Sequence, residues 1–153
     1  MSDEPLETMA GTTFRLMYRS RDRLPAEDRQ DELGDLFARA RSNNRKRNIT
    51  GALLLSGHWF VQVLEGEEAD VRSLFARIQG DPRHDGVELL FAGRTDARIF
   101  AHWSMAKVTL ADPPDIPLIA QISEISPVSS REMTPPKNRL LDVMRDAIDD
   151  TIV

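Results

Sequence analysis

The chain of 153 residues contains no cysteine. This absence excludes disulfides, thiolate-bound zinc, iron–sulfur clusters and cysteine nucleophiles. A chain of this length buries a hydrophobic core without such crosslinks. We therefore expect a soluble globular protein made of one domain, or of one domain with an extension.

Long apolar runs are also missing. No stretch approaches the roughly 20 apolar residues that span a bilayer, and the acidic N-terminus lacks a basic segment followed by an apolar one. We therefore expect a cytoplasmic protein with no membrane partner. The net charge is −5, and residues 112–153 supply most of it, with eight acidic and four basic residues. The nearly balanced charge of the remaining chain disfavours nucleic acid as a partner.

Familiar catalytic motifs are absent as well. The sequence has no glycine-rich nucleotide loop, no His-Glu-x-x-His and no Gly-x-Ser-x-Gly. His58 and His102 have no second ligand at a spacing that suits a metal ion, so we predict no metal site. Aromatic residues are few, with one Tyr, two Trp and six Phe, so the position of each Tyr and Trp is informative.

Hydrophobic periodicity predicts the order of the secondary structure. Apolar residues at alternate positions predict strands, and apolar residues at i, i+3, i+4 and i+7 predict helices. The order β-α-β-β-α-β-β predicts an α+β fold, a ferredoxin-like sandwich whose five-stranded mixed sheet carries two helices on one face. The predicted elements are strands at 12–19, 49–55, 59–65, 87–93 and 103–109, a helix from Pro25 to about Asn44 and a helix at 67–79.

The chain divides into three parts at the level of its sequence. Residues 1–11 are expected to form a leader, 12–110 the folded domain and 111–153 a helical extension. Prolines recur in the extension, which we predict to hold short helices at 118–125 and 137–152. The second helix has one apolar side, so we expect it to dock on the sheet or on a partner.

Two polar residues fall on apolar strand faces. Tyr18 shares a face with apolar neighbours on the first strand, and Gln62 does so on the third predicted strand segment. A buried phenol usually has a hydrogen-bond partner, and a buried amide has two N–H donors and an acceptor to satisfy. The pair could be an ordinary part of the core, or water, backbone or a polar heterocycle could complete its hydrogen bonds.

Two further pairs allow an ordinary explanation. Asn43 and Asn44 stand at the end of the first predicted helix, where Asn is common. Trp103 and Met105 stand two residues apart on the last predicted strand and could simply belong to the core. By themselves these residues predict only a domain that binds something flat between its two helices.

Six short motifs follow one another along residues 12–110. They are Tyr18-Arg19-Ser20, Asn43-Asn44, Ile49-Thr50-Gly51, Phe60-Val61-Gln62-Val63-Leu64-Glu65-Gly66, Asp81-Pro82-Arg83-His84 and Trp103-Ser104-Met105. Taken together, in this order and at these spacings, they resemble the BLUF family of blue-light sensors that use flavin. The resemblance implies a flavin cofactor, with FAD as the first expectation and FMN or riboflavin as alternatives.

The resemblance implies where the flavin ring contacts the chain. Leu36 and Ile78 would pack on the two faces of the ring, and Asn44, aided by Asn43, would bind its polar edge. Gln62 would face N5 and O4 of the ring. The other cofactor contacts implied, near the pyrimidine side or the ribityl chain, are Arg77, Asp81, Arg83 and His84.

The resemblance also implies a photochemical mechanism without enzymatic turnover. Tyr18 would give an electron to the excited flavin and, through Gln62, a proton. Gln62 would end rotated or tautomerised, and its new hydrogen bond would shift the absorption to the red. Trp103 and Met105 would relay this change through the last strand to the extension. The missing cysteine excludes the thiol adduct that other flavin photoreceptors form.

The expected output is a contact with a protein, either a homo-oligomer or a separate effector. Two other functions stay open from the sequence. One is a ferredoxin-fold hydrolase similar to acylphosphatase, although no glycine-containing phosphate loop lies between Arg21 and Pro25. The other is a light-insensitive module that binds flavin or another small ligand.

Overall fold

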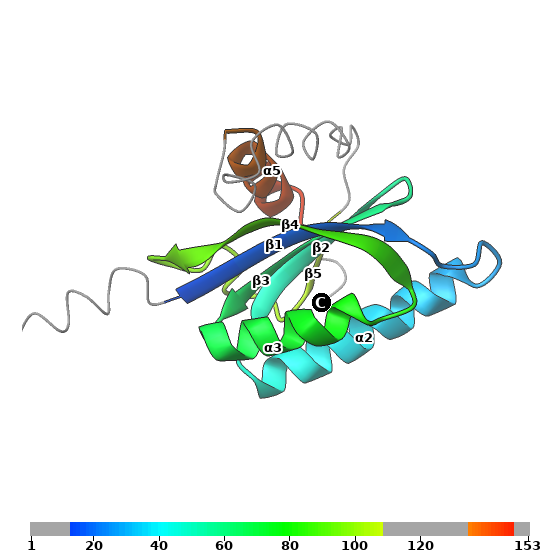
Figure 1. Cartoon of the computed structure of the whole chain (residues 1–153), viewed down its shortest axis with the longest axis horizontal. Helices are drawn as coiled ribbons and strands as arrows, with labels where there is room; N and C mark the ends of the chain where they lie inside the picture. The colour runs from blue at the N-terminus through cyan, green and yellow to red at the C-terminus, as the bar shows by residue number, and fades with distance from the viewer. Residues whose placement is uncertain (1–12, 109–134, 149–153) are drawn as a thin grey trace, which may run out of the picture.

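The computed structural model describes residues 13–108 and 135–148. Within these residues the elements follow the predicted order, and one further helix lies towards the C-terminus (Figure 1). The elements are β1 (Thr13–Asp22), α2 (Arg29–Lys46), β2 (Thr50–Ser56), β3 (Trp59–Gly66), α3 (Glu68–Gln79), β4 (His84–Thr95), β5 (Ala106–Val108) and α5 (Pro135–Asp146).

The five strands form one mixed sheet in the order β4-β1-β3-β2-β5. β1 is antiparallel to both β3 and β4, and β2 is antiparallel to β3. β5 joins the edge of β2 in parallel. The sheet therefore confirms the predicted α+β, ferredoxin-like fold. It places β1 and β3, which carry Tyr18 and Gln62, side by side in its interior.

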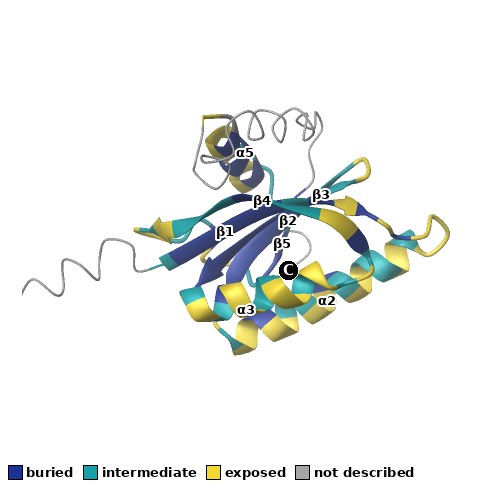
Figure 2. Ribbon diagram, viewed as in Figure 1, coloured by how far each residue is buried: buried dark blue, intermediate teal, exposed yellow. Residues whose placement is uncertain are grey.

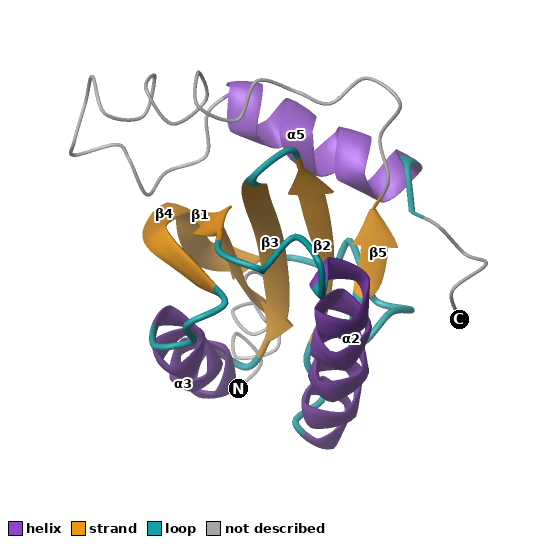
Figure 3. Cartoon of the chain, turned by 90° about the vertical axis from the view of Figure 1, so that its right-hand side faces the viewer, coloured by secondary structure: helices purple, strands orange, loops and turns teal. Residues whose placement is uncertain are grey.

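Helices cover both faces of the sheet. α2 and α3 lie on one face, and α5 crosses the opposite face, as two perpendicular views show (Figures 1 and 3). The apolar stripes of α2 and α3 explain the first arrangement. α5 contributes Leu140, Leu141 and Met144, which are at most 2% exposed. A helix is thus present in the extension and docks on the sheet, but it spans Pro135–Asp146 rather than the expected 137–152, because Ile148 pairs with Val108 instead of continuing the helix.

The sheet has a hydrophobic cluster on each side. The cluster under α2 and α3 includes Phe14, Leu16 and Tyr18, whereas the cluster under α5 includes Met17. β1 is buried on both faces along most of its length (Figure 2). The alternation predicts one buried face, and Met17 is fully buried because α5 covers the other.

The first helix begins and ends later than predicted. Residues 26–28 form a turn, and the helix begins at Arg29 rather than at Pro25. Asp22 holds this turn, because its Oδ1 accepts a hydrogen bond from the Leu24 amide at 2.7 Å and its carboxylate pairs with Arg29. The helix then continues through the two asparagines to Lys46.

The last strand is shorter than predicted. β5 comprises only Ala106–Val108, so Trp103 and Met105 lie in the segment that precedes it. The expectation that both residues stand on the strand was wrong. The backbone carbonyls of residues 103–105 accept hydrogen bonds from the Gly51 amide of β2 and from the side chains of Asn44 and Arg41 of α2. They take no part in regular strand pairing.

The leader at 1–11, the helix expected at 118–125 and the last residues of the extension lie outside the described residues. The proposed boundaries at 12, 110 and 111 likewise remain predictions. Among the described helices, none combines the length and the apolar character that crossing a bilayer requires.

Candidate functional site

A cavity of about 240 Å³ lies between α2, α3 and the face of the sheet that they cover. The sequence predicted twelve site residues, and all of them apart from Trp103 and Met105 line this cavity. The predicted residues brought together here are Tyr18, Leu36, Asn43, Asn44, Gln62, Arg77, Ile78, Asp81, Arg83 and His84. The cavity is therefore the candidate site.

The walls of the cavity are apolar and come from two helices. Leu36 and Ala40 of α2 and Leu74 and Ile78 of α3 line it and are only partly buried. These residues belong to the stripes that point at the sheet, since the i, i+3, i+4 spacing places them on one side of each helix. The two helices thus present apolar side chains to the space between them.

Tyr18 and Gln62 form the polar centre of the cavity floor. They are cross-strand partners of β1 and β3, and the Tyr18 hydroxyl donates a hydrogen bond to Oε1 of Gln62. Nε2 of Gln62 donates in turn to Sδ of Met105 at 3.6 Å. Their exposed fractions are 3% and 5%, so both side chains are held in place with little access to water.

Burial keeps the Tyr18 phenol neutral. Removal from water raises the pKa of Tyr18 far above its ordinary value of 10, and the nearby negative charge of Asp81 raises it further. A neutral phenol is a hydrogen-bond donor, which agrees with its bond to the Gln62 oxygen. Any chemistry that oxidises this phenol must also accommodate its proton.

The two asparagines have different environments. Asn44 is 2% exposed and its Nδ2 donates to the Ser104 carbonyl at 2.7 Å. Among the described residues its Oδ1 has no hydrogen-bond partner, and the residue lines the cavity. Asn43 also lines the cavity but is exposed. This difference arises because α2 continues past both residues and turns only Asn44 towards the sheet.

Asp81 and Arg83 form a compact ion pair at the end of α3. Nη2 and Nε of Arg83 donate to Oδ2 and Oδ1 of Asp81 at 2.6 and 3.0 Å, and the Arg83 amide also donates to Oδ1. The Arg83 guanidinium holds the pKa of Asp81 below its usual range. Both residues line the cavity and are about one quarter exposed, so the site has a charged rim.

His84 lines the cavity, but both of its ring nitrogens already have partners. Nε2 lies 2.6 Å from the carbonyl of Ile78, so it donates there, and Nδ1 then accepts from the Ser20 hydroxyl at 2.7 Å. The ring also packs edge-on against Tyr18 at a centroid distance of 6.0 Å. His84 thus connects β1 to the end of α3 and fixes the surroundings of Tyr18.

Met105 and Trp103 separate to opposite sides of the sheet. Met105 is 2% exposed, belongs to the cluster under α2 and α3, and contacts Gln62. Trp103 packs against the cluster under α5. The sequence left open which of the two lies next to the cavity, and in this structure it is Met105.

Three residues near the site were not predicted. Nε of Arg41 donates to the Met105 carbonyl at 3.1 Å, and the Gly51 amide donates to the Trp103 carbonyl at 3.0 Å. A side chain at Gly51 would collide with the Val63 carbonyl, which explains the glycine. The third is Glu65, a fully buried carboxylate. An acidic residue inside a predicted buried strand was the signal that could have revealed it.

A comparison with protein families agrees with this geometry. Residues 13–106 match the family described as "BLUF: Sensors of blue-light using FAD". This match covers more than half of the chain. The chain belongs to the BLUF family.

Relatives and solved structures carry the same domain. Among relatives, the photoactivated adenylate cyclase subunits beta and alpha of Euglena gracilis are each 36% identical over 91 residues, which is 60% of this chain. Among solved structures, the dark state of the BLUF protein BlrB is 28% identical, with a TM-score of 0.66 over 91% of this chain and 97% of that one. The ground state of BlsA is 27% identical, with a TM-score of 0.68 and 87% coverage of both chains.

The cyclase relatives are much longer proteins. The match covers 11% of the beta subunit and 9% of the alpha subunit. Similarly, the Klebsiella pneumoniae BlrP1 structure, 33% identical with a TM-score of 0.62, is covered over 33% of its length by 88% of this chain. The chain therefore spans only a small part of the length of these relatives.

The residues of the cavity fit the flavin that BLUF domains bind. A flat, amphipathic ring requires apolar walls and hydrogen-bonding groups along its edge. Leu36 and Ile78 supply apolar groups from the two helices, and Asn44 and Gln62 supply buried amides. The oxygen of Asn44 that lacks a partner within the described residues is available as an acceptor.

Proposed function

We propose that this chain is a blue-light photoreceptor in which Tyr18 and Gln62 convert absorption of light into a rearranged hydrogen-bond network. The observation that carries this proposal is the buried Tyr18–Gln62 hydrogen bond on the floor of a cavity that fits a flavin. A bound flavin supplies the absorption of blue light and, once excited, a strong oxidant. The remaining steps belong to side chains of this protein.

Tyr18 is the electron donor of the proposed photocycle. Because its phenol is neutral and buried, loss of an electron must be accompanied by loss of its proton. The hydrogen bond to Oε1 of Gln62 directs that proton onto the amide. When the electron and the proton return to Tyr18, Gln62 is left in a rotated or tautomeric form.

Met105 detects the new state of Gln62. In this structure an N–H of Gln62 points at Sδ of Met105, and the side-chain oxygen of Gln62 points at Tyr18. A rotated amide places its oxygen beside the sulfur and its N–H groups beside the phenol. The contact with Met105 then has no donor, and the Tyr18 hydroxyl must accept a hydrogen bond from the amide instead of donating one. Met105 then shifts, and β5 begins at the next residue.

The other cavity residues hold and orient the cofactor. Leu36 and Ile78 would pack on the two faces of the ring, and Asn44, with Asn43 at the rim, would bind its polar edge. Arg77 and the charged rim of Asp81 and Arg83 would face the ribityl side, whereas His84 would act through the position of Tyr18 and α3. We include FAD as the cofactor in this proposal, with FMN and riboflavin as alternatives that satisfy the same ring contacts.

The output of the sensor is a contact with a protein. We assign the sensor to residues 12–110 and the output to the extension at 111–153, of which α5 is the described part. The shift at Met105 reaches α5 because Val108 at the end of β5 pairs with Ile148 just after α5. The partner is a second copy of the chain or a separate effector. The protein acts in the cytoplasm, the location that the sequence predicts.

An absorption spectrum recorded in the dark and directly after blue light tests this function. We expect a yellow protein whose flavin bands move reversibly to the red. A protein that stays colourless after flavin is added would contradict the assignment of the cavity. A yellow protein whose spectrum light does not change would instead be a light-insensitive flavin-binding module, and the Tyr18–Gln62 mechanism would be wrong.

A further inference from the structure

Two polar pairs join β1 to β3 on opposite faces of the sheet. Tyr18 is the cross-strand partner of Gln62, and Arg15 is the cross-strand partner of Glu65. The pairs are three residues apart on both strands, and side chains alternate along a strand, so the second pair lies on the face that α5 covers. Glu65 is fully buried and Arg15 is 8% exposed.

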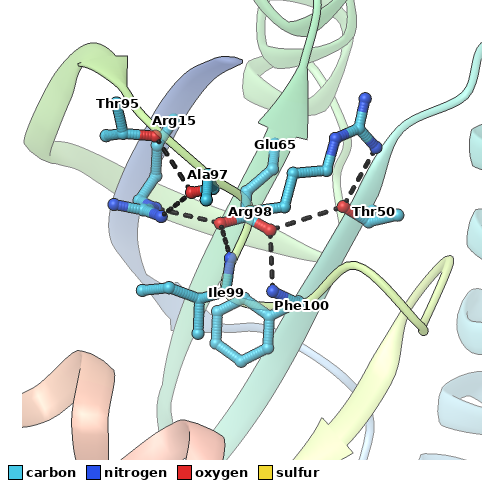
Figure 4. Close-up of polar contacts among 8 residues, drawn as sticks. All are labelled: Arg15, Thr50, Glu65, Thr95, Ala97, Arg98, Ile99 and Phe100. Atoms are coloured by element: carbon cyan, nitrogen blue, oxygen red, sulfur yellow. Dashed lines mark hydrogen bonds and ion pairs between the residues drawn. The ribbon is translucent and has the colours of Figure 1, made fainter. Parts of the chain in front are cut away.

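Glu65 binds the segment that connects β4 to β5. Its Oε2 accepts from Nε of Arg15 at 3.0 Å and from the Ile99 amide at 2.7 Å, and its Oε1 accepts from the Phe100 amide at 2.8 Å. Figure 4 shows these contacts converging on the one carboxylate. Arg15 also donates to the Ala97 carbonyl at 3.0 Å. The ion pair thus holds three positions at the start of this segment.

The same segment ends at the photochemical pair. The Phe100 carbonyl accepts a hydrogen bond from the Trp103 amide at 3.1 Å. The carbonyl of the next residue, Ser104, accepts one from Nδ2 of Asn44. Met105 follows and contacts Gln62. One strand, β3, therefore holds both ends of residues 97–105, through Glu65 on one face and through Gln62 on the other.

We propose that Glu65 is a positioning residue of the photocycle, which anchors residues 97–105 so that Met105 stays packed against Gln62. This inference rests on the photocycle proposed above. The firm position of Met105 opposes movement of the Gln62 amide, and so it slows the return of the light state to the dark state.

A carboxylate is the group that this position requires. Three N–H donors, two from consecutive backbone amides and one from a guanidinium, converge on it, and a carboxylate only accepts. Glutamine has the same shape, but its NH₂ group would face one or two of these donors. Buried donors would then lose their partners, which loosens the segment.

The variant Glu65→Gln in the full chain tests the anchor. We expect the flavin to bind and the reversible red shift to form, with dark recovery about tenfold faster than in the wild type. Hydrogen exchange of the Ile99 and Phe100 amides should also become faster, and this readout needs neither light nor flavin. The matched control is Glu88→Gln, which weakens the Arg19–Glu88 pair on the same face of β1 but leaves residues 97–105 untouched.

A double-mutant cycle separates positioning from a general loss of stability. If Glu65 acts through Met105, then Glu65→Gln should change recovery by less than about twofold in a Met105→Ala background. Unchanged recovery in Glu65→Gln, equal acceleration in Glu88→Gln, or full acceleration in the Met105→Ala background would each overturn the proposal.

A milder variant covers the case in which Glu65→Gln does not fold. Thr50→Val removes the hydroxyl that donates to Oε1 of Glu65 at 3.4 Å and accepts from Nη1 of Arg98 at 3.2 Å. Because the first contact supports the Glu65 carboxylate and the second binds residues 97–105 to β2, we expect recovery about two- to threefold faster. Recovery equal to that of the wild type would then contradict the anchor. If the wild type shows no light-induced shift at all, the proposed function fails, whereas a normal wild-type shift with unaffected variants overturns only the role of Glu65.

Discussion

Tyr18 and Gln62 are cross-strand neighbours on β1 and β3, and a hydrogen bond also joins their side chains. The backbone ladder therefore sets the geometry of the proposed photochemical pair, and neither side chain stands on a loop. Adjacent strands keep their side chains a fixed distance apart. A reaction that needs a donor and its proton acceptor in constant contact benefits from this arrangement.

Replacement of this donor should abolish the photocycle and keep the cofactor. We expect Tyr18→Phe to bind flavin but to lose the reversible red shift. Its free energy of unfolding should fall by about 1 kcal/mol, because Oε1 of Gln62 loses its buried donor. Light and dark absorption spectra and urea unfolding measure the two effects. The chain has no second tyrosine, so a normal photocycle in this variant would point to Trp59 or Trp103 as the donor.

The single tyrosine allows its protonation to be followed directly. Because the folded state raises the pKa of Tyr18, the phenol should stay protonated above pH 10 for as long as the protein is folded. The contribution of Tyr18 to stability is complete below pH 10 and decreases above it, by about 1.4 kcal/mol per pH unit. Tyrosinate absorbance should therefore appear together with the loss of circular dichroism, and the urea-unfolded chain should titrate near pH 10. Tyrosinate in a folded protein at pH 10 would contradict this.

Met105 and Trp103 should differ in their influence on light-driven spectra. Met105 touches Gln62, so Met105→Ala should accelerate dark recovery by about tenfold, since its removal frees space for the amide to move. Trp103 packs on the other side of the sheet, and Trp103→Phe should change recovery by less than about threefold. Flash absorption measurements of the rate of dark recovery in both variants test this difference. The reverse ranking would show that Trp103 takes the position beside Gln62.

Docking of α5 should matter for stability but not for the colour change. Met144 is fully buried between α5 and the sheet, so Met144→Ala should lower the free energy of unfolding by about 2–5 kcal/mol. The red shift should persist, because the cavity lies on the opposite face. Arg145→Ala, at an exposed neighbouring position, is the control and should stay within about 0.5 kcal/mol. Equal unfolding midpoints for the two variants would argue against the docking of this helix.

Much of the fold follows from local patterns. The alternation in β1 and β3 and the stripes on α2 and α3 predict the order of the elements, since strand and helix periods differ. Boundaries were less predictable. α2 begins at Arg29 because the Asp22 carboxylate holds the preceding turn, and that contact joins residues whose pairing no local pattern indicates.

The site shows the same division. Tyr18 and Gln62 stand out in the sequence because each is a polar residue among apolar neighbours on a strand. Glu65 carries a similar signal, but its role depends on Ile99 and Phe100, more than thirty residues away. Nε of Arg41 donates to the Met105 carbonyl, sixty-four residues further along the chain, and no local pattern indicates this contact. Only the folded chain brings these groups together.

By itself, the sequence determined the fold class, the two helices that line the cavity and the two polar residues, Tyr18 and Gln62, that stand on apolar strand faces, because periodicity and buried polarity are local properties. The tertiary structure decided that Met105 rather than Trp103 contacts Gln62, that α5 covers the second face of the sheet and that Glu65 anchors the segment between β4 and β5. These features depend on contacts between residues that are distant in the sequence, and the properties of a single segment do not specify such contacts.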